Sequence, residues 1–273
     1  MGAHPIRIIS DVHYGDRSCR VRSLDRLRPL LEGASAFVFN GDTLDTRPSE
    51  DAARTESLRR EVLEFASSAP IPVTLLTGNH DPDLTGDSSL ELAGGAVLVT
   101  HGDILFDAIV PWSKDAPVIR ERIAAALAGA PRDGPGALEG RLAAFRSVAA
   151  SVHQLHQSET NPLRYVAKLA TDTVWPPHRV VSILKAWSQA PGRAAALAER
   201  HRPGARFIIT GHTHRPGVWR MPSGVTVINT GSFSRPFGAM AAEVSDDGVR
   251  VRRVDERGGE YRPGREVAHF PLP

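Results

Sequence analysis

The sequence predicts a mixed α/β protein in which one long helical segment interrupts the strands. Short apolar runs alternate with amphipathic segments, and each run stops at a glycine or a polar side chain, as buried strands do at a sheet edge. About a hundred consecutive residues are instead rich in Ala, Arg and Leu at helical spacing. The chain has 273 residues, 41% of them hydrophobic and 23% charged, so it can bury a sizeable core.

These patterns divide the chain into two parts. We expect residues 1–104 and 206–273 to form a strand-bearing core and residues 105–205 to form a helical insertion, a cap or a lid. Residues 104–206 contain fourteen Lys or Arg and eight Asp or Glu, a local charge of +6 in a chain of net charge +2. A basic insertion beside an acidic core would suit an anionic substrate. The alternative is that Arg is simply the favoured surface residue of this chain.

The start of the chain and its cysteine content predict a cytoplasmic protein. No apolar run is long enough to span a bilayer, and residues 1–5 lack the basic and apolar regions of a signal peptide. Cys19 is the only cysteine, so no intramolecular disulfide can form. The small net charge gives no argument for nucleic-acid binding.

The first predicted strand, residues 6–9, leads into two polar side chains. Asp11 and His13 point to the same side if the segment stays extended, so they can converge on one ion. Residues 21–32 then place leucines at the spacing of an amphipathic helix.

The second predicted strand, residues 36–39, ends at a glycine turn that carries acidic residues. Asp42 emerges at the strand end, and its two carboxylate oxygens can each serve a different cation. Asp45 has two equally weighted interpretations, a helix or turn cap and a functional residue. Residues 49–66 predict a polar helix.

The third predicted strand, residues 73–76, delivers an amide, an imidazole and a carboxylate side by side. The carbonyl oxygen of Asn79 suits a hard divalent cation, and His80 stays free for proton transfer. Another strand, residues 96–100, ends at His101.

The insertion is predicted to be helical. Helices are expected at 119–127, 137–155, 164–170, 180–187 and 191–201. Its histidines are expected to be surface or core residues and not metal ligands: His153, His156, His178 and His201.

The strands resume with residues 206–210, which lead into His212 and His214. These two histidines again share one side if the segment is extended. Further strands are expected at 225–228, 239–244 and 249–254, the last two as a hairpin. The Gly- and Pro-rich tail from Arg257 is expected to lie on the surface.

The strand-end loops together supply seven oxygen and nitrogen donors and no thiolate. They are Asp11, His13, Asp42, Asn79, His101, His212 and His214. Seven are too many for one ion and suit two. The set and its order resemble the calcineurin-like metallophosphoesterase family, with Asp11-Val12-His13, Gly41-Asp42-Thr43-Leu44-Asp45, Gly78-Asn79-His80-Asp81, His101-Gly102 and Gly211-His212-Thr213-His214 as the matching motifs. The match covers residues 6–104 and 206–244.

The resemblance implies a fold and a reaction. The fold is an αββα four-layer arrangement, a two-sheet β-sandwich flanked by helices. The reaction is hydrolysis of a phosphomonoester, phosphodiester or pyrophosphate bond by a hydroxide that two divalent ions activate.

The resemblance also implies a role for each residue. One ion is held by Asp11, His13 and His214 and the other by Asn79, His101 and His212, with Asp42 shared. His80 is the general acid, Asp45 orients it, and Arg215 contacts phosphate or remains a solvated loop residue. Manganese is favoured, with iron, zinc and cobalt left open.

The substrate is expected to be an anionic phosphate ester, with small nucleotides favoured over nucleic acid. UDP-2,3-diacylglucosamine pyrophosphohydrolases of lipid A synthesis offer the closest architecture, since they carry a helical lid at the same place. Phe145, Trp175 and Trp187 would then line an acyl-chain groove, although those enzymes typically have Arg at the position of His80. A metal-binding scaffold with vestigial activity is the alternative of another class. Such members usually lack the general-acid histidine or several ligands, all of which this chain keeps.

Overall fold

The computed structural model describes residues 4–131, 133–134, 136–154 and 178–272. Two sheets form the centre of the described structure. The predicted helix at 164–170, His156 and Trp175 lie outside the described residues.

The first sheet has six strands in the order β11-β10-β9-β1-β2-β3. Its parallel half consists of β1 (Ile6–Ile9), β2 (Ala36–Asn40) and β3 (Val73–Leu76). Its antiparallel half consists of β9 (Met240–Ser245), β10 (Gly248–Arg257) and β11 (Glu260–Phe270). The predicted hairpin near residue 246 is confirmed as β9 and β10.

The second sheet has five strands in the order β4-β5-β6-β8-β7. The three parallel strands are β5 (Val97–Thr100), β6 (Phe207–Thr210) and β8 (Thr226–Asn229). The antiparallel edges are β4 (Ser89–Leu92) and β7 (Gly217–Arg220), neither of which the sequence predicted. Both edge strands have partly exposed residues, so their hydrophobic pattern is weak.

Alternate residues of each strand face different cores, which shows that the layers are helix, sheet, sheet and helix. In the first sheet, Ile8 and Val38 pack between the sheets, whereas Phe37 and Phe39 face the outer helices. In the second sheet, Ile209 packs between the sheets. Ile208, Leu98 and Val227 face the other helical layer. The predicted two-sheet sandwich flanked by helices is therefore confirmed.

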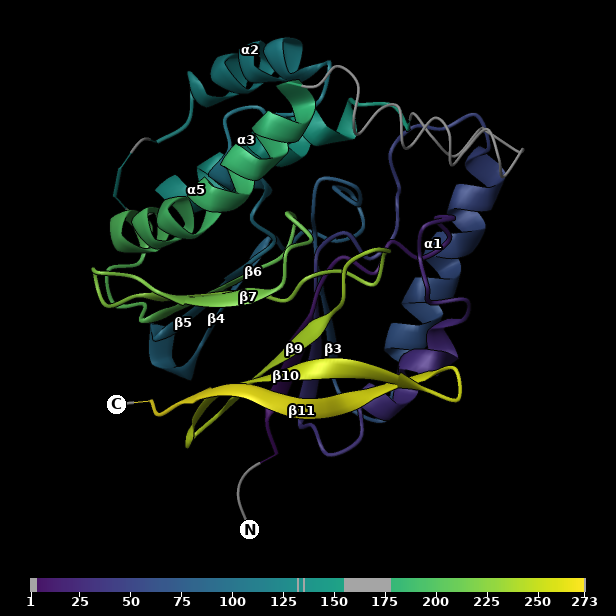
Figure 1. Ribbon diagram of the computed structural model, residues 1–273. Coiled ribbons are helices and arrows are strands. Elements are labelled where there is room, and N and C mark those ends of the chain that lie inside the picture. The colour runs from purple at the N-terminus through teal and green to yellow at the C-terminus, as the bar shows by residue number, and fades with distance from the viewer. Residues whose placement is uncertain (1–3, 132, 135, 155–177, 273) are drawn as a thin grey trace.

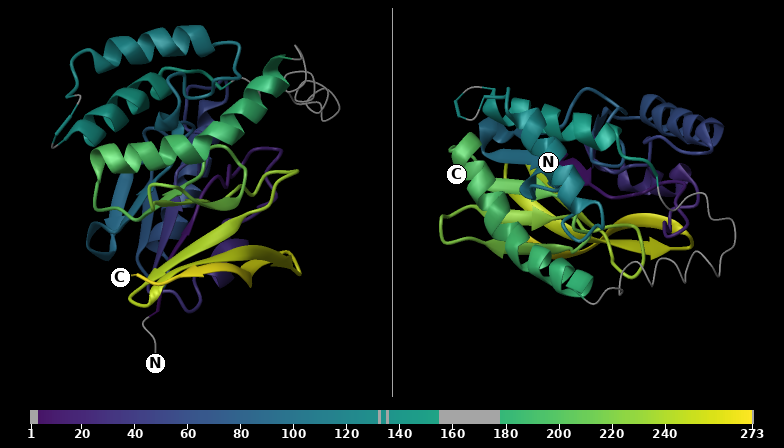
Figure 2. Two further views of the ribbon diagram at one scale, coloured as in Figure 1. Left: turned by 60° about the vertical axis from the view of Figure 1, so that its left-hand side comes forward. Right: turned by 90° about the horizontal axis from the view of Figure 1, so that it is seen from above.

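Helices cover the outer faces of both sheets (Figures 1 and 2). The first sheet packs against a short 3₁₀ helix, η1 (Leu24–Leu30), and against α1 (Ala52–Ser67). The second packs against α2 (Ala116–Leu127), α3 (Ala137–Ala150) and α5 (His178–His201). Two further 3₁₀ turns, η2 (Ala93–Gly95) and η3 (Asp103–Leu105), flank β5. The described helices of the 105–205 segment, α2, α3 and α5, thus share one core with the second sheet.

Two helix predictions need correction. The amphipathic helix expected at 21–32 is the shorter 3₁₀ helix η1, which contains Pro29. The two helices expected at 180–187 and 191–201 are one continuous helix, α5, which runs through Pro191. A proline removes one backbone donor and favours a helix boundary without enforcing it.

The C-terminal tail lies at the surface as predicted, but the strand that it forms was not predicted. Residues 260–270 form β11, the edge strand of the first sheet, paired with β10 along its length. Pro263 is tolerated because an edge strand does not need every N–H for the ladder, and the register shifts nearby mark bulges. A strand whose residues are mostly exposed has no apolar pattern to reveal it.

Candidate metal centre

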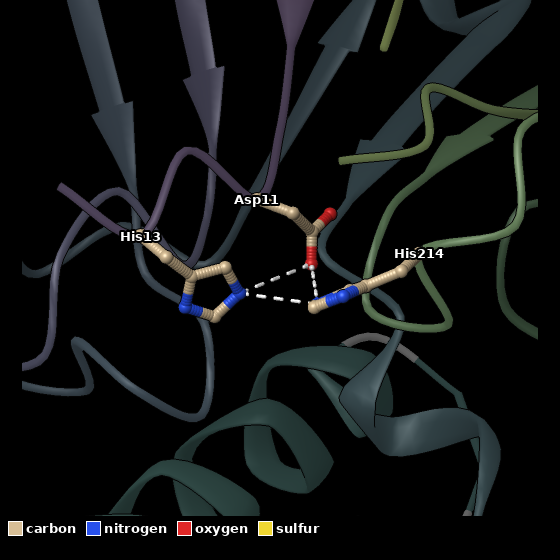
Figure 3. Close-up of side chains that lie close together, drawn as sticks. All are labelled: Asp11, His13 and His214. Carbon is tan, nitrogen blue, oxygen red and sulfur yellow. Dashed lines mark hydrogen bonds and ion pairs between the residues drawn. The ribbon is translucent and has the colours of Figure 1, made fainter. Parts of the chain in front are cut away.

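The loops after β1 and β6 bring three predicted ligands together. Figure 3 shows Asp11, His13 and His214 pointing toward one another. The Nε2 atom of His214 lies 3.2 Å from Asp11 Oδ1 and 3.1 Å from His13 Nε2, while His13 Nε2 lies 3.9 Å from Asp11 Oδ1. One donor atom from each residue fits within a 4.8 Å cluster, which is a size that could hold a cation.

A second cluster lies beside the first, and the Asp42 carboxylate lies near residues of both. Asp42, His101 and His212 again place one donor atom each within 4.8 Å of one another, and all three are buried. Asp42 Oδ2 lies 3.2 Å from His101 Nε2 and 3.8 Å from His13 Nε2. Asp42 therefore contacts residues of both clusters.

Five of the seven predicted ligands have left-handed backbone angles. The φ values are 52° at Asp11, His13 and Asp42, 64° at His212 and 58° at His214. Side chains other than glycine rarely adopt this conformation, and such strain collects at functional sites. Backbone hydrogen bonds between loops hold it: His13 donates to the Asp42 carbonyl at 3.0 Å and Asp11 to the Gly41 carbonyl at 3.1 Å.

Two glycines allow the loops to approach this closely. A Cβ atom on Gly211 would lie 2.1 Å from Asp11 Oδ2, and one on Gly78 would lie 2.3 Å from Asp42 Oδ1. Neither distance is compatible with a side chain at these positions, so the glycines of both motifs are required by packing.

The pKa values of three side chains in the clusters are shifted toward the forms that donate electron pairs to a metal ion. Burial, with the charges of neighbouring histidines, lowers the pKa of both His13 and His212 to about 4, so both rings are neutral at pH 7. Burial alone would raise the pKa of Asp42, but the charges of His101 and His80 outweigh it and hold that pKa well below its usual range. The structure thus combines the neutral imidazoles of His13 and His212 with the ionised carboxylate of Asp42, the forms that bind metal.

Backbone carbonyls fix which nitrogen of two ligands faces the cluster. His101 Nδ1 donates to the Asn40 carbonyl at 2.9 Å, which leaves Nε2 toward Asp42. His212 Nε2 donates to the Ile109 carbonyl at 3.0 Å, which leaves Nδ1. Such outer contacts orient metal-binding histidines.

Two buried donor atoms have the chemistry that a metal ion would satisfy. Asn79 Oδ1 and His101 Nε2 have no hydrogen-bond partner among the described residues, although the Asp42 carboxylate lies close to the latter. A buried polar atom without a partner costs about 1–3 kcal/mol, so it is rare unless something else binds it. Both atoms belong to the set that the sequence assigned to the second ion.

His80 lies at the edge of the clusters and is held by its own partners. Its ring contacts that of His13 edge-on at 4.9 Å, and its Nδ1 lies 3.0 Å from Asp45 Oδ2. Arg47 donates to both carboxylate oxygens of Asp45 and lies 2.9 Å from the same His80 nitrogen. Burial and Arg47 lower the pKa of His80, but the charges of Asp42 and Asp45 outweigh them and raise it above its usual value.

Arg215 makes its hydrogen bond and its ring contact outside the clusters. It is exposed, and its guanidinium lies 5.7 Å from the Trp219 ring centre. It also donates to the Trp187 carbonyl at 3.3 Å. That carbonyl is available because Pro191, four residues later in α5, has no N–H to bond it.

Sequence reasoning missed three residues that build the site. Asn40 on β2 donates to Thr100 and Ile209 of the second sheet, which joins the two sheets at the site edge. Asp81 accepts from the backbone N–H groups of Gly78, Asp42 and Thr43 and so joins two loops. Arg47 was the third. Asn40 and Asp81 stand within or beside the motifs, so their position was the available signal; Arg47 gave none.

This fold and this donor set define a metal-dependent hydrolase. The sequence profile of the calcineurin-like phosphoesterases matches residues 4–216, most of the chain, and the chain belongs to that family. It is therefore a metal-dependent phosphoester hydrolase of a family that uses two metal ions.

Among curated proteins, the chain is similar to a UDP-2,3-diacylglucosamine hydrolase of Stenotrophomonas maltophilia. The two are 24% identical over 232 residues, which cover 79% of this chain and 84% of the relative. Among solved structures, a dimetal phosphatase from Danio rerio aligns with a TM-score of 0.45 and 15% identity over 93% of this chain and 96% of that one. Vps29 from Chaetomium thermophilum aligns with a TM-score of 0.44 and 12% identity over 99% and 100%.

Among the residues that the structure describes, no helix combines the length and the apolar character that a bilayer crossing requires.

Proposed function

We propose that the chain hydrolyses a phosphate ester at the two clusters, with Asp42 shared between two divalent ions. Asp11, His13 and His214 would hold one ion, and Asn79, His101 and His212 the other. The observation that carries this proposal is the position of Asp42, whose Oδ2 lies within 4 Å of a histidine from each set. When bound, two such ions activate water and offset negative charge on the phosphoryl oxygens.

The protein's own contribution to bond cleavage is a proton from His80. As the oxygen of water bonds to phosphorus, the bond to the leaving oxygen breaks, and His80 Nε2 gives that oxygen a proton. Asp45 holds Nδ1 on the opposite side of the ring, so Nε2 is the nitrogen left for the substrate. Arg47 fixes Asp45 and adds a positive charge that makes the ring a stronger acid.

The finer assignments belong to the same proposal. Manganese is the ion we favour, and Arg215 would reach the substrate phosphate from the loop after β6. The division at residues 105–205 would make α2, α3 and α5 a cap over the site. A cytoplasmic location is favoured because the chain's one cysteine, Cys19, is free and buried.

The test is hydrolysis of 4-nitrophenyl phosphate and bis(4-nitrophenyl) phosphate by the manganese-loaded protein. We expect hydrolysis that EDTA abolishes and manganese restores, and a fall of about 10²-fold in His80→Ala. The matched control is His4→Ala, an exposed histidine near the N-terminus. A well-metallated protein that hydrolyses neither ester nor any natural phosphate ester would support the scaffold alternative.

A second candidate substrate is UDP-2,3-diacylglucosamine, favoured by exposed apolar side chains on α5. Val180, Val181 and Leu184 are 36%, 65% and 55% exposed. They precede Trp187, whose ring packs on Phe237 beside His214. One part of the predicted acyl groove is wrong: Phe145 is completely buried in the core under α3 and cannot line an open surface.

Phosphorus NMR distinguishes the two substrates. Release of UMP from the lipid, with a loss of that activity in Val181→Asp and Leu184→Asp, would support the lipid substrate. Cleavage confined to soluble nucleotide esters would contradict it.

A further inference from the structure

One residue of the helical segment holds the loop that carries Asp45. Gln154 lies four residues beyond the end of α3, and its Nε2 donates to the carbonyls of Asp45 at 3.0 Å and Arg47 at 2.8 Å. Its backbone N–H donates to the Pro48 carbonyl at 2.9 Å. Three hydrogen bonds from one residue therefore fix residues 45–48.

The chemistry of these contacts requires a donor at this position. Both partners of the side chain are carbonyl oxygens, which only accept, so the amide must present its NH₂ group to them. The two N–H bonds of the Gln154 amide donate one hydrogen bond to each of the two carbonyls. No carboxylate or aliphatic side chain can replace that arrangement.

The loop that Gln154 fixes is bonded to His80 through both backbone and side chains. Thr46 N–H donates to the His80 carbonyl at 2.9 Å, and the Asp45 carboxylate and the Arg47 guanidinium both lie within 3.0 Å of His80 Nδ1. A shift of the loop would move both groups that orient the ring.

The position of Gln154 depends on the hydrophobic core between the helical layer and the second sheet. The α3 helix that leads to it packs with the second sheet, through residues such as Leu142 and Phe145. Asp45 follows β2 of the first sheet. Gln154 thus links the helical layer over one sheet to a catalytic loop of the other.

We propose that Gln154 is a positioning residue for His80, through which the helical segment aligns proton transfer to the leaving group. This inference rests on the proposed function. It assigns a role to residue 154 that neither the family motifs nor the metal donors contain.

The test is the dependence of kcat on the leaving group in Gln154→Met, a variant of similar length without the N–H donors. We expect kcat to fall about 10-fold for phenyl phosphate esters, whose leaving group needs a proton. The 2,4-dinitrophenyl esters should react at the wild-type rate because their leaving group departs without one. KM and manganese stoichiometry should not change. Gln189→Met on α5 is the matched control and should match wild type with both esters.

Three results would overturn the inference. They are wild-type rates with phenyl esters, an equal loss with both leaving groups, and a further loss when Gln154→Met is added to His80→Ala. If Gln154→Met does not reach the wild-type thermal unfolding midpoint, Gln154→Glu takes its place with the same expectations. Wild-type protein without any hydrolysis would contradict the proposed function itself, whereas hydrolysis that needs His80 but not Gln154 would contradict only this inference.

Discussion

Two sets of buried charges begin only a few residues apart in the chain, one on β1 and one in the loop that follows it, and they differ completely in how they are balanced. Arg7, in the middle of β1, pairs with Glu243 of β9 at 2.7 Å, and both are 5% exposed. Arg7 also donates to the Leu30 and Glu32 carbonyls, while Arg252 donates to the second oxygen of Glu243. This ion pair is complete within the protein.

In the cluster that begins at Asp11, by contrast, neighbouring residues do not satisfy every buried polar atom. Two buried carboxylates, Asp11 and Asp42, face imidazoles on strained loops, and two donor atoms have no partner among the described residues. Burial of charge does not by itself indicate function. What indicates a cation site is a set of buried donors that their neighbours cannot satisfy.

The largest expected effect is on activity, from Asp42→Asn. Losing the shared carboxylate should lower kcat by about 10³-fold or more, because metal ions supply several kcal/mol of transition-state stabilisation. Urea unfolding of the metal-free variant should show at most a modest loss of stability, because the change removes the repulsion between Asp42 and Asp11 together with the attraction of His101 and His80 for Asp42. A stability loss as large as that of a core mutation would show that the cluster is structural.

The reciprocal change is Glu243→Gln, which leaves Arg7 buried without its carboxylate. Breaking one partner of such a pair costs about 3 kcal/mol of unfolding free energy, measured in urea. Hydrolysis at a temperature where the variant is folded should match wild type. If Glu243→Gln reduces kcat as strongly as Asp42→Asn does, the two regions are not independent.

Manganese should stabilise the cluster and leave the ion pair unaffected. At a free concentration 100-fold above Kd, binding to the folded state alone adds about 2.7 kcal/mol of unfolding free energy per site. The increase should persist in Glu243→Gln and be reduced in Asp42→Asn. An equal increase in both variants would place the bound ion elsewhere.

The smallest expected effect is a proton released when manganese binds. Burial lowers the pKa of His101, but the charges of Asp42 and Asp11 outweigh it and raise the pKa well above 6.5. This shift favours the protonated form of metal-free His101, and a cation at Nε2 displaces the proton, so the affinity for manganese rises with pH. His13 and His212, with a pKa of about 4, release none. Calorimetry in buffers of different ionisation enthalpy measures the release, and His101→Asn should remove it.

Much of the fold could be predicted from the sequence because buried strands and metal-donor residues produce local sequence patterns. The strands at 6–9 and 73–76 were placed at their observed bounds, and the strand at 36–39 ends one residue later than expected. Each is a short apolar run that stops at a turn. The edge strands β4, β7 and β11 could not be predicted, because exposed strands have no apolar pattern. Their pairing also depends on segments elsewhere in the chain.

The sequence alone indicated the central strands, the motifs, the family and which side chains could be metal donors. Tertiary structure alone decided how those donors face one another and what holds them. Gln154 lies 109 residues from Asp45, and Ile109 lies 103 residues from His212. Hydropathy and spacing report whether a residue is buried and which of its near neighbours share its face. They do not report which distant backbone carbonyl its side chain will meet, because that depends on how the layers pack.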